Sequence, residues 1–461
     1  KPHSICYDWQ KIFSTKGKTM LGNKAVNEKN HLEIAGCDVV LLADKLGTPL
    51  YVFDEALLRE NMREYKKAFE ERYPEVSIAF AGKAFLCSAM CRVLGQEGLW
   101  LDTVSGGEYY TALGSGFPVE QVLFHGNNKS PEEHSLVLKN GIGRWVIDSE
   151  SELDLLIEEA QKYERGKLPV FFRITPGIDP HTHAFITTGK VDSKFGLPLM
   201  EGIALRVVQK ALSCGYLDVK GIHCHIGSQI DTLEPFGKAI EVMVRFLAEV
   251  GEKTRCLLPE LDLGGGLGVP YLDEDKGRFP SVESYAEIIC GAVKENCQKY
   301  KVPLPHLFVE PGRSIGNTAG STIYRVGTVK EIPGIKKYVA VDGGMADNPR
   351  PVLYDAKYQA LVGNRVLGGG KEKVSIVGKC CETGDVIIGD TELVPVMRGD
   401  VLVVEGTGAY NHSMASNYNM IPRPGVVFIR EGKPVLVVRP ESWYDLTRRD
   451  IIPDYLQEEG E

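Results

Sequence analysis

Lys83 is the residue of this chain whose surroundings most favour covalent chemistry. It follows an apolar run, Val76–Phe80, and lies in the segment Ala-Phe-Ala-Gly-Lys-Ala-Phe. Burial among apolar neighbours lowers the pKa of a lysine, and a neutral amine can form a Schiff base with a carbonyl group. A lysine that merely reaches solvent from the end of a strand would look the same. The prediction of a reactive amine therefore depends on the residues that accompany it.

A glycine-rich segment follows a second apolar run, in the order Asp262-Leu263-Gly264-Gly265-Gly266-Leu267-Gly268. Glycines let backbone N–H groups approach a phosphate closely. The dinucleotide fingerprint Gly-x-Gly-x-x-Gly is not met, because its last position falls on Val269 or on Tyr271. The segment favours a site for a single phosphate over a nicotinamide site, and a tight turn from strand to helix is the alternative.

Two histidines, His223 and His225, are placed two residues apart, on one side of a predicted strand, with Ser228 just beyond them. No CxxC or HExxH motif accompanies them, so we expect no metal. An imidazole at the end of a strand can instead stack on a planar ring, and the Ser228 hydroxyl can bind phosphate. His181 and His183 precede Thr187–Gly196 in a polar loop that is a candidate lid.

Carboxylates and one thiol complete the set of candidate residues. Glu310 stands in Glu-Pro-Gly-Arg, and a buried carboxylate that faces a pyridine nitrogen keeps that nitrogen protonated, which makes the ring a better electron sink. An ordinary ion pair with Arg313 is the alternative. Further along, Cys381 precedes Glu382, and a thiol beside a carboxylate can act as a proton donor.

The elements that must position these residues follow a strand-and-helix alternation from Val76 to Ser314, with amphipathic segments between short apolar runs. Eight such runs with interleaved helices match a closed (β/α)8 TIM barrel, in which the carboxyl ends of the strands meet at one face. The expected strands are Val76–Phe80, Leu99–Val104, Val122–His125, Arg144–Asp148, Val170–Ile174, Val219–His225, Leu261–Leu263 and Leu307–Val309.

After Ser314 the pattern changes to short β-branched runs between turns that contain Gly or Pro, which predicts a C-terminal all-β domain. Its expected strands are Ile323–Val326, Tyr338–Val341, Val374–Val377, Asp385–Ile388, Val401–Val404 and Val426–Arg430. Pro49–Phe53, ahead of a helix at Glu55–Glu70, is expected to join that domain as an N-terminal strand. We therefore divide the chain into an N-terminal extension (1–36), a segment that joins the β domain (37–54), an α/β barrel (55–315) and the β domain (316–461).

Composition excludes several classes of protein. The chain has 461 residues with 43% apolar and 25% charged side chains, typical of a folded globular protein, and a net charge of −9 argues against nucleic-acid binding. Eleven cysteines are too sparse for a disulfide scaffold, and no stretch is apolar enough to span a membrane. We expect a cytoplasmic protein, or one of an organelle stroma if its N-terminus is that of a processed precursor.

Taken together and in order, these segments resemble the diaminopimelate decarboxylases, which belong to the alanine-racemase-like class of pyridoxal phosphate enzymes. The resemblance covers about Asp38 to Asp454. The matching segments are Phe80–Ala84, Asp102 with Ser105–Glu108, His125–Lys129, His225–Gln229, Gly264–Gly266, Glu310–Arg313, Asp342–Met345, Arg350–Tyr354, Cys381–Asp385 and Gly408–Tyr410. The departures are mild, such as Thr383 where Ser is usual.

The resemblance implies pyridoxal 5'-phosphate as the cofactor. Lys83 would form the Schiff base with it, His225 would stack on its ring, and Glu310 would meet its pyridine nitrogen. The other residues implied to bind the cofactor are Asp102, Ser228, Gly265, Gly266, Gly312, Arg313 and Tyr410.

The resemblance also implies the reaction, which is decarboxylation of meso-2,6-diaminopimelate to L-lysine and CO2. Cys381 would be the proton donor, and its loop would reach the site of the other subunit, which implies a homodimer with shared active sites. The residues implied to bind the substrate are Arg313, Arg350, Tyr354, Glu382 and Tyr410.

Physical chemistry favours this substrate over simple diamine precursors. Diaminopimelate carries a carboxylate at its far end, which Arg313 and Arg350 can bind, whereas an acidic residue in place of Arg350 would have favoured a basic amino acid. Two alternatives stay open at this point. One is a related decarboxylase of basic amino acids or of carboxynorspermidine, and the other is a catalytically silent regulatory homologue.

Overall fold

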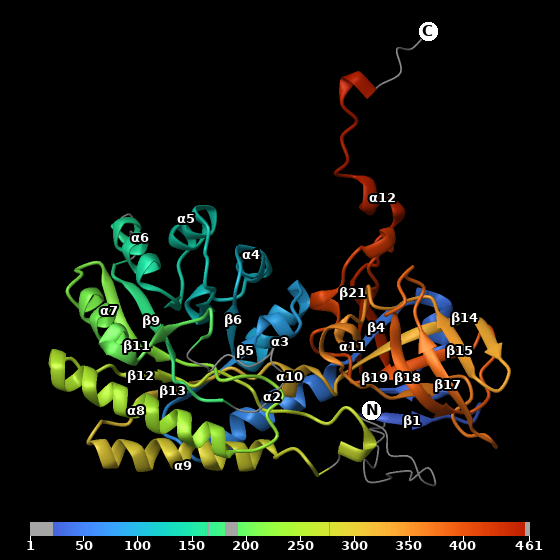
Figure 1. Ribbon diagram of the computed structural model, residues 1–461, viewed down its shortest axis with the longest axis horizontal. Helices are drawn as coiled ribbons and strands as arrows, with labels where there is room; N and C mark the ends of the chain where they lie inside the picture. The colour runs from blue at the N-terminus through green and yellow to red at the C-terminus, as the bar shows by residue number, and fades with distance from the viewer. Residues whose placement is uncertain (1–21, 162, 164–165, 180–191, 276, 457–461) are drawn as a thin grey trace, which may run out of the picture.

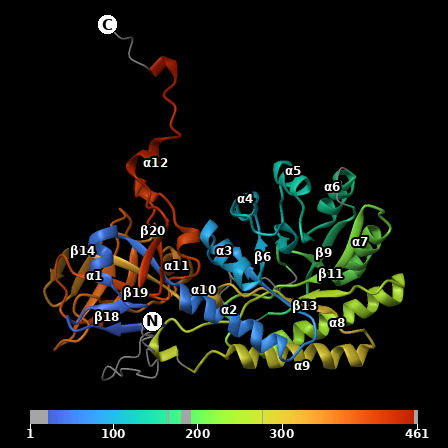
Figure 2. The same ribbon diagram turned by 180° about the vertical axis from the view of Figure 1, so that it is seen from behind.

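The computed structural model describes residues 22–161, 163, 166–179, 192–275 and 277–456. Figure 1 shows a barrel beside a domain of β-sheet, with the long helix α2 (Glu55–Glu70) running from the β domain along the barrel. The view from behind in Figure 2 shows the same two bodies side by side.

The barrel is a closed sheet of parallel strands, as the alternating pattern predicts. The sheet runs in the order β9-β11-β12-β13-β5-β6-β7-β8, and pairing of β8 with β9 closes it. The strands in this part of the described chain are β5 (Val76–Ala81), β6 (Trp100–Thr103), β7 (Val122–Phe124), β8 (Arg144–Ile147), β9 (Leu168–Thr175), β11 (Leu217–His223), β12 (Glu260–Asp262) and β13 (His306–Val309). The expected (β/α)8 barrel is confirmed, and each strand lies within about two residues of its prediction.

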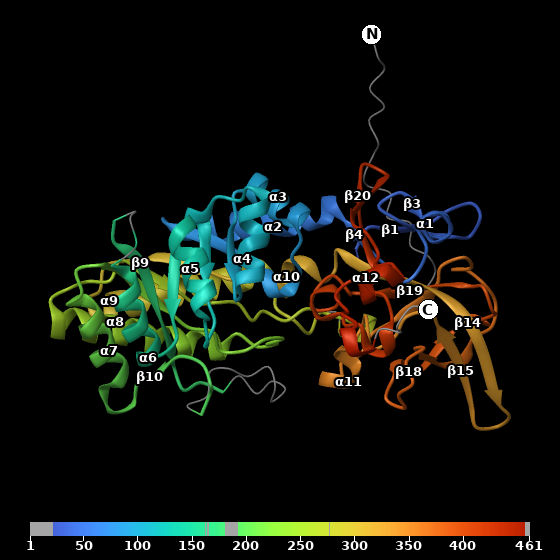
Figure 3. The same ribbon diagram turned by 90° about the horizontal axis from the view of Figure 1, so that it is seen from above.

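Helices follow the strands and cover the outside of the barrel (Figures 1 and 3). They are α3 (Ser88–Glu97), α4 (Gly106–Ser115), α5 (Pro131–Asn140), α6 (Glu150–Ala160), α7 (Ile203–Leu212), α8 (Glu234–Thr254) and α9 (Val282–Tyr300). None of the helices in the described part of the chain is long and apolar enough to cross a membrane.

Capping residues explain where these helices begin and end. Helix α2 begins at Glu55 because the Asp54 side chain accepts a hydrogen bond from the N–H of Leu57. Helix α5 begins with a capping box, in which Ser130 and Glu133 satisfy each other's backbone N–H groups. Helix α4 ends at Gly116, whose φ of 72° favours glycine.

The β domain is a second sheet, and it takes an N-terminal strand as expected. Strand β4 (Leu50–Asp54) lies between β14 (Gly320–Ile332) and β20 (Gly425–Arg430), antiparallel to the first and parallel to the second. The other strands are β15 (Lys336–Val341), β16 (Ala360–Val362), β17 (Glu372–Val377), β18 (Val386–Leu393), β19 (Val401–Glu405) and β21 (Lys433–Val438). The strand pattern did not predict β16 or β21.

Two strands of a small sheet lie in the expected N-terminal extension, and its third strand lies just beyond residue 36. Strands β1 (Lys24–Val26), β2 (Leu32–Ile34) and β3 (Cys37–Asp38) pair antiparallel, ahead of α1 (Val39–Leu46). At the other end of the chain, α12 (Trp443–Thr447) projects away from both domains (Figures 1 and 2). The division of the chain at residues 36, 54 and 315 remains a prediction.

One loop of the barrel reaches into the core of the β domain. Val269 and Tyr271, which follow β12 and its glycines, are buried in the hydrophobic cluster formed by strands of the β domain such as β14 and β19. The carboxyl ends of the barrel strands therefore face the β domain, and the space between the two is where the candidate residues meet.

Candidate active site

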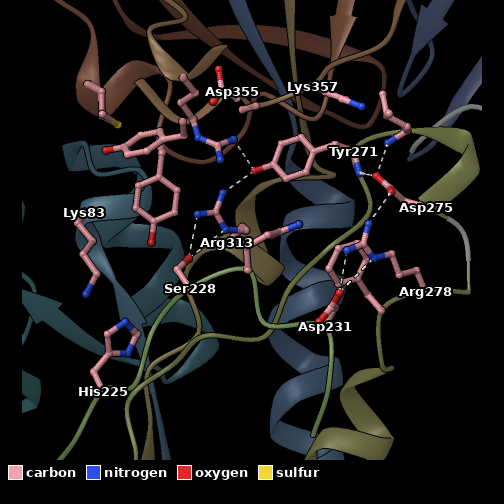
Figure 4. A pocket seen from close by; sticks show the side chains of 18 of the residues that line it. Lys83, His225, Ser228, Asp231, Tyr271, Asp275, Arg278, Arg313, Asp355 and Lys357 are labelled. Carbon is pink, nitrogen blue, oxygen red and sulfur yellow. Dashed lines mark hydrogen bonds and ion pairs between the residues drawn. The ribbon is translucent and has the colours of Figure 1, made fainter. Parts of the chain in front are cut away.

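A cavity of about 840 Å³ lies at the carboxyl ends of the barrel strands, against the β domain. Figure 4 shows that side chains from both domains point into it. The residues predicted for the site that line it are Lys83, His225, Ser228, Arg313, Arg350, Tyr354 and Tyr410. Segments far apart in the sequence thus meet in one pocket, as the barrel prediction requires.

Lys83 is held by a carboxylate on the neighbouring strand. Its Nζ lies 3.0 Å from Oδ2 of Asp102, which is buried at the end of β6. Burial lowers the pKa of the Lys83 amine, but Asp102, with Tyr410 and Glu310, outweighs burial and raises the pKa above its usual value. The expectation of a depressed pKa was wrong, because the apolar sequence neighbours gave no sign of a carboxylate across the strand pair.

Glu310 follows β13 and is the centre of a buried polar cluster, and it is not among the residues that line the cavity. Its carboxylate lies 2.7 Å from Nε2 of His125 and 3.2 Å from Nε2 of His223. Burial raises the pKa of Glu310, but these two imidazoles outweigh burial and hold the pKa well below its usual range. The carboxylate is therefore ionised. This state is the one required of the predicted partner of a protonated pyridine nitrogen.

Asp262 completes this cluster at the end of β12. One ring nitrogen or carboxylate oxygen from each of His125, His223, Asp262 and Glu310 lies within 4.8 Å of the others. Burial and the nearby Glu310 raise the pKa of Asp262 well above its usual value, and burial lowers the pKa of His223 to about 3. In this cluster Glu310 is therefore readily ionised, Asp262 resists ionisation, and His223 is neutral.

Sequence reasoning did not assign roles to His125, His223 and Asp262 as partners of Glu310. The available signal was their position, since each lies at or just after the end of a barrel strand. Strands β7, β11, β12 and β13 carry these residues, and only closure of the barrel brings β7 across from the other three.

The glycines after β12 allow backbone segments to approach one another closely. A Cβ on Gly265 would lie 2.2 Å from the carbonyl oxygen of Glu310, and Gly266 has a φ of 125° that favours glycine. The N–H of Gly265 donates to Nδ1 of His225 at 3.2 Å, which orients the imidazole. Gly312 is similarly confined, because a Cβ there would lie 2.9 Å from the Cβ of Ala81. This packing fits a site where backbone must come close to a bound group.

Two guanidinium groups form the opposite side of the cavity. Arg313 donates to Oγ of Ser228 at 2.9 Å, and its Cζ lies 4.6 Å from the ring centroid of Tyr410. Arg350, at the start of α11 (Arg350–Tyr354), donates to the hydroxyl of Tyr358 at 2.8 Å. Both arginines are buried, and together they form a strongly cationic wall that suits a carboxylate or a phosphate.

Tyr271 joins the two arginines and was not predicted. Its hydroxyl accepts a hydrogen bond from Arg313 at 2.6 Å (Figure 4) and another from Arg350 at 2.7 Å. In the sequence, Tyr271 stood out only as a position at which the dinucleotide fingerprint is not met. Its role depends on the contact between the domains, which no local pattern encodes.

Cys381 and Glu382 do not line this cavity. Cys381 is exposed in the loop between β17 and β18, where its N–H donates to Oδ1 of Asn419 at 2.7 Å. Glu382 lines a different, smaller hollow of about 310 Å³ on the β domain, together with Thr383 and Asp385. Within one chain, these two residues are therefore separate from the pocket of Lys83.

The candidate lid is only partly covered by the structure. His181, His183 and the part of the loop up to residue 191 lie outside the described residues. Phe195, at the far end of the loop, lines the cavity, and its ring centroid lies 4.4 Å from Cζ of Arg173. The N–H of Gly196 donates to Oδ2 of Asp148 at 3.0 Å.

Comparison with known proteins identifies the family. Residues 56–317 match the family model of the pyridoxal-dependent decarboxylase, pyridoxal binding domain. The diaminopimelate decarboxylase of Bacillus subtilis (strain 168) is 46% identical over 430 residues, which cover 93% of this chain and 97% of that protein. The enzyme of the same name from Bacillus methanolicus is 47% identical over 418 residues, covering 91% and 96%.

A solved structure agrees with the sequence relatives. The crystal structure of diaminopimelate decarboxylase from M. jannaschii in co-complex with L-lysine has a TM-score of 0.87 and 37% identity, and the match covers 95% of this chain and 100% of that one. The family binds pyridoxal phosphate, and the strand-end lysine, the glycine turns and the buried Glu310 fit such a cofactor. The chain belongs to the diaminopimelate decarboxylases, a family of pyridoxal-phosphate-dependent decarboxylases.

Proposed function

We propose that this enzyme decarboxylates meso-2,6-diaminopimelate to L-lysine and CO2, the last step of lysine biosynthesis. The observation that carries the proposal is that Arg313 and Arg350 share one cavity with Lys83. Two guanidiniums in the cavity of Lys83 favour a substrate that carries a second, distal carboxylate. The names of the curated relatives support the same substrate.

The residues around Lys83 would hold the cofactor. Lys83 would bind it covalently, His225 would lie against its ring, and Glu310 would keep a proton on its pyridine nitrogen. When bound, pyridoxal phosphate supplies an electron sink for the bond to the departing carboxylate. The phosphate would be held by the Ser228 hydroxyl, the backbone of Gly265 and Gly266, the turn at Gly312-Arg313 and the Tyr410 hydroxyl. Asp102 would orient Lys83.

The buried cluster around Glu310 supports its proposed role. His125 and His223 hold its carboxylate in place and lower its pKa, so the carboxylate keeps its charge without solvent. A fixed, ionised carboxylate stabilises a protonated ring nitrogen more than a solvated one would. Glu310 would thereby make the pyridine ring a better electron sink. His125 and His223 would position the Glu310 carboxylate.

The distal end of the substrate would be bound by residues of two subunits. Arg313, Arg350, Tyr354 and Tyr410 would bind the distal carboxylate and the chain leading to it. Glu382 of a second copy would form an ion pair with the distal ammonium group. A carboxylate at that place would favour substrates with a positive charge at the non-reacting centre.

Cys381 of the second copy would deliver a proton from its thiol to the carbon that lost CO2. Support for this arrangement comes from the exposure of Cys381 and from its absence among the residues that line the cavity of its own chain. A site that needs Cys381 is completed only by another subunit, so we propose a homodimer with shared active sites.

We place the enzyme in the cytoplasm. The ten cysteines in the described part of the chain are all free, and several are buried, which is the pattern expected in a reducing compartment.

The proposal is tested by measuring the L-lysine released from meso-diaminopimelate by the purified protein. Parallel reactions contain no added pyridoxal phosphate, or contain lysine, ornithine or arginine as the substrate. We expect cofactor-dependent release of lysine and CO2 from diaminopimelate alone. Release of a diamine from lysine or ornithine would favour a related decarboxylase, and no turnover of any substrate despite bound cofactor would favour a silent homologue.

A further inference from the structure

The hydroxyl of Tyr271 is the shared acceptor of the two guanidinium groups in the cavity. Arg313 Nη1 and Arg350 Nη1 donate to it at 2.6 and 2.7 Å. All three side chains are at most 7% exposed. Two buried cations that lie this close repel each other, and the phenol oxygen between them offsets part of that repulsion by accepting a hydrogen bond from each.

Tyr271 is itself firmly placed. Its ring packs edge-to-face on that of Tyr358, with centroids 5.3 Å apart and planes at 88°. Its N–H donates to Oδ2 of Asp275 at 3.1 Å. Two residues earlier, Val269 exchanges backbone hydrogen bonds with the Gln229 side chain, at 2.6 and 3.3 Å. The loop is thus fastened on both sides of Tyr271, and its hydroxyl can set the positions of the arginines.

The arginines keep donor capacity for a ligand. Nε of Arg350 is buried and has no hydrogen-bond partner among the described residues, although Arg350 lines the cavity. A buried guanidinium donor without a partner is costly, so an acceptor group is expected there when the site is filled. A carboxylate offers acceptors in the planar geometry that a guanidinium fork matches.

We propose that Tyr271 is a positioning and specificity-determining residue, whose hydroxyl holds Arg313 and Arg350 at the spacing that reads the distal carboxylate of the substrate. This inference rests on the proposed function. The tyrosine does not touch the reacting bond. It links an arginine that follows a barrel strand to an arginine of the β domain, so that the two act on one ligand group.

The test compares two ligands of the holoenzyme by isothermal titration calorimetry. L-Lysine keeps the distal carboxylate, and cadaverine lacks it. In Tyr271→Phe we expect the affinity for L-lysine to fall about tenfold or more, and the affinity for cadaverine to change less than about twofold. In steady-state assays the KM for meso-diaminopimelate should rise about tenfold, with kcat within about threefold of the wild-type value.

A matched control removes a buried tyrosine hydroxyl elsewhere. Tyr73 donates to the carbonyl oxygen of Pro305 at 2.8 Å and is not among the residues that line the cavity, so Tyr73→Phe should leave both ligand affinities unchanged. If Phe at position 271 destabilises the fold too far for assay, Tyr271→His keeps a ring with an acceptor nitrogen and should show the same selective loss in weaker form.

The outcomes separate this inference from the proposed function. A wild-type enzyme that does not decarboxylate diaminopimelate would overturn both. A wild-type enzyme that does so, with Tyr271→Phe binding L-lysine normally, would overturn the role of Tyr271 alone. Equal losses for L-lysine and cadaverine, or loss of the absorbance of bound cofactor, would show a merely structural tyrosine and would also overturn it.

Discussion

The amine of Lys83 lies 3.0 Å from the carboxylate of Asp102, which is buried at the end of the adjacent barrel strand. Parallel pairing of β5 with β6, with Ala81 opposite Asp102, brings the two side chains together. The charge of Asp102 keeps the amine protonated in the protein without cofactor. Attachment of a carbonyl group requires the neutral amine, so we expect Asp102 to set the pH at which Lys83 reacts with the cofactor.

Replacing Asp102 with Asn should lower the pKa of Lys83, because the variant loses the main charge that raises it. At a fixed pH below that pKa, covalent uptake of pyridoxal phosphate by the apoprotein should become faster, by about tenfold for each unit of pKa lost. The measurement is the absorbance of bound cofactor against time at several pH values. Asp154→Asn, which breaks the exposed pair with Lys210, is the control; an unchanged pH profile in D102N would contradict the role of Asp102.

Lys83→Ala should abolish covalent attachment of the cofactor and leave the fold intact, because Lys83 stands at a strand end and only its amine bonds to Asp102. Turnover should fall by on the order of 10³-fold or more. Borohydride reduction followed by mass spectrometry should find a phosphopyridoxyl group in the wild type and none in the variant. The exposed Lys238→Ala is the control, and normal turnover by K83A would exclude Lys83 as the attachment site.

Arg350→Lys keeps the positive charge but loses the planar fork that matches a carboxylate. Loss of a hydrogen bond to a charged group costs about 1.5–3 kcal/mol, so the KM for meso-diaminopimelate should rise roughly 10- to 100-fold. Circular dichroism checks the fold, and Arg63→Lys on the surface is the control. An unchanged KM in R350K would remove Arg350 from substrate binding.

Mixing two inactive variants tests the shared active site. Lys83→Ala and Cys381→Ala homodimers should each be nearly inactive, whereas subunit exchange creates heterodimers in which one of two sites has both residues. If the subunits of a twofold dimer exchange at random, activity should recover to about a quarter of the wild-type value. The activity of the mixture is followed over time, with K83A mixed with itself as the control. No recovery after proven exchange would place Cys381 in the site of its own chain or outside catalysis.

The pH dependence of stability should reflect the buried His412. Burial lowers the pKa of its imidazole to about 4, below the ordinary 6.5 of an unfolded chain. Between these values the unfolded chain binds the proton and the folded one does not, so stability is fully present above pH 6.5 and falls as the pH drops towards 4. The loss from this group is at most roughly 3 kcal/mol.

His412→Phe removes the titration and keeps an aromatic ring beside Tyr51 and Phe85. The fall in the free energy of unfolding between pH 6.5 and 4, measured by urea denaturation, should be smaller in this variant than in the wild type. An equal fall in both proteins would show that His412 does not titrate as its burial implies.

Much of the fold could be predicted because its signals are local. The apolar runs and amphipathic helices of the barrel repeat in order, and the helix Glu55–Glu70 has the predicted bounds, with Asp54 as its cap. Strands β16 and β21 were not predicted: β16 is only three residues long, and β21 is largely exposed although it is apolar from Val435 to Val438.

The residue types at the strand ends predicted the chemistry of the site. Lys83, the turn with Ser228, the glycines after β12 and Glu310 follow four barrel strands, and barrel closure alone makes their convergence predictable. Tertiary structure decided their electrostatics. The pKa of Lys83 is raised, not lowered, because its carboxylate partner belongs to a different strand.

The tyrosine between the arginines and the histidines around Glu310 could not have been assigned from the sequence. Each depends on long-range contacts, between the domains for Tyr271 and across the barrel for His125. A sequence encodes which side chains stand at the ends of its strands, because periodicity and turn residues are local. It does not reveal which charges will lie within a few ångströms of one another, since those distances, and the pKa values they set, arise only when the barrel closes and packs on the β domain.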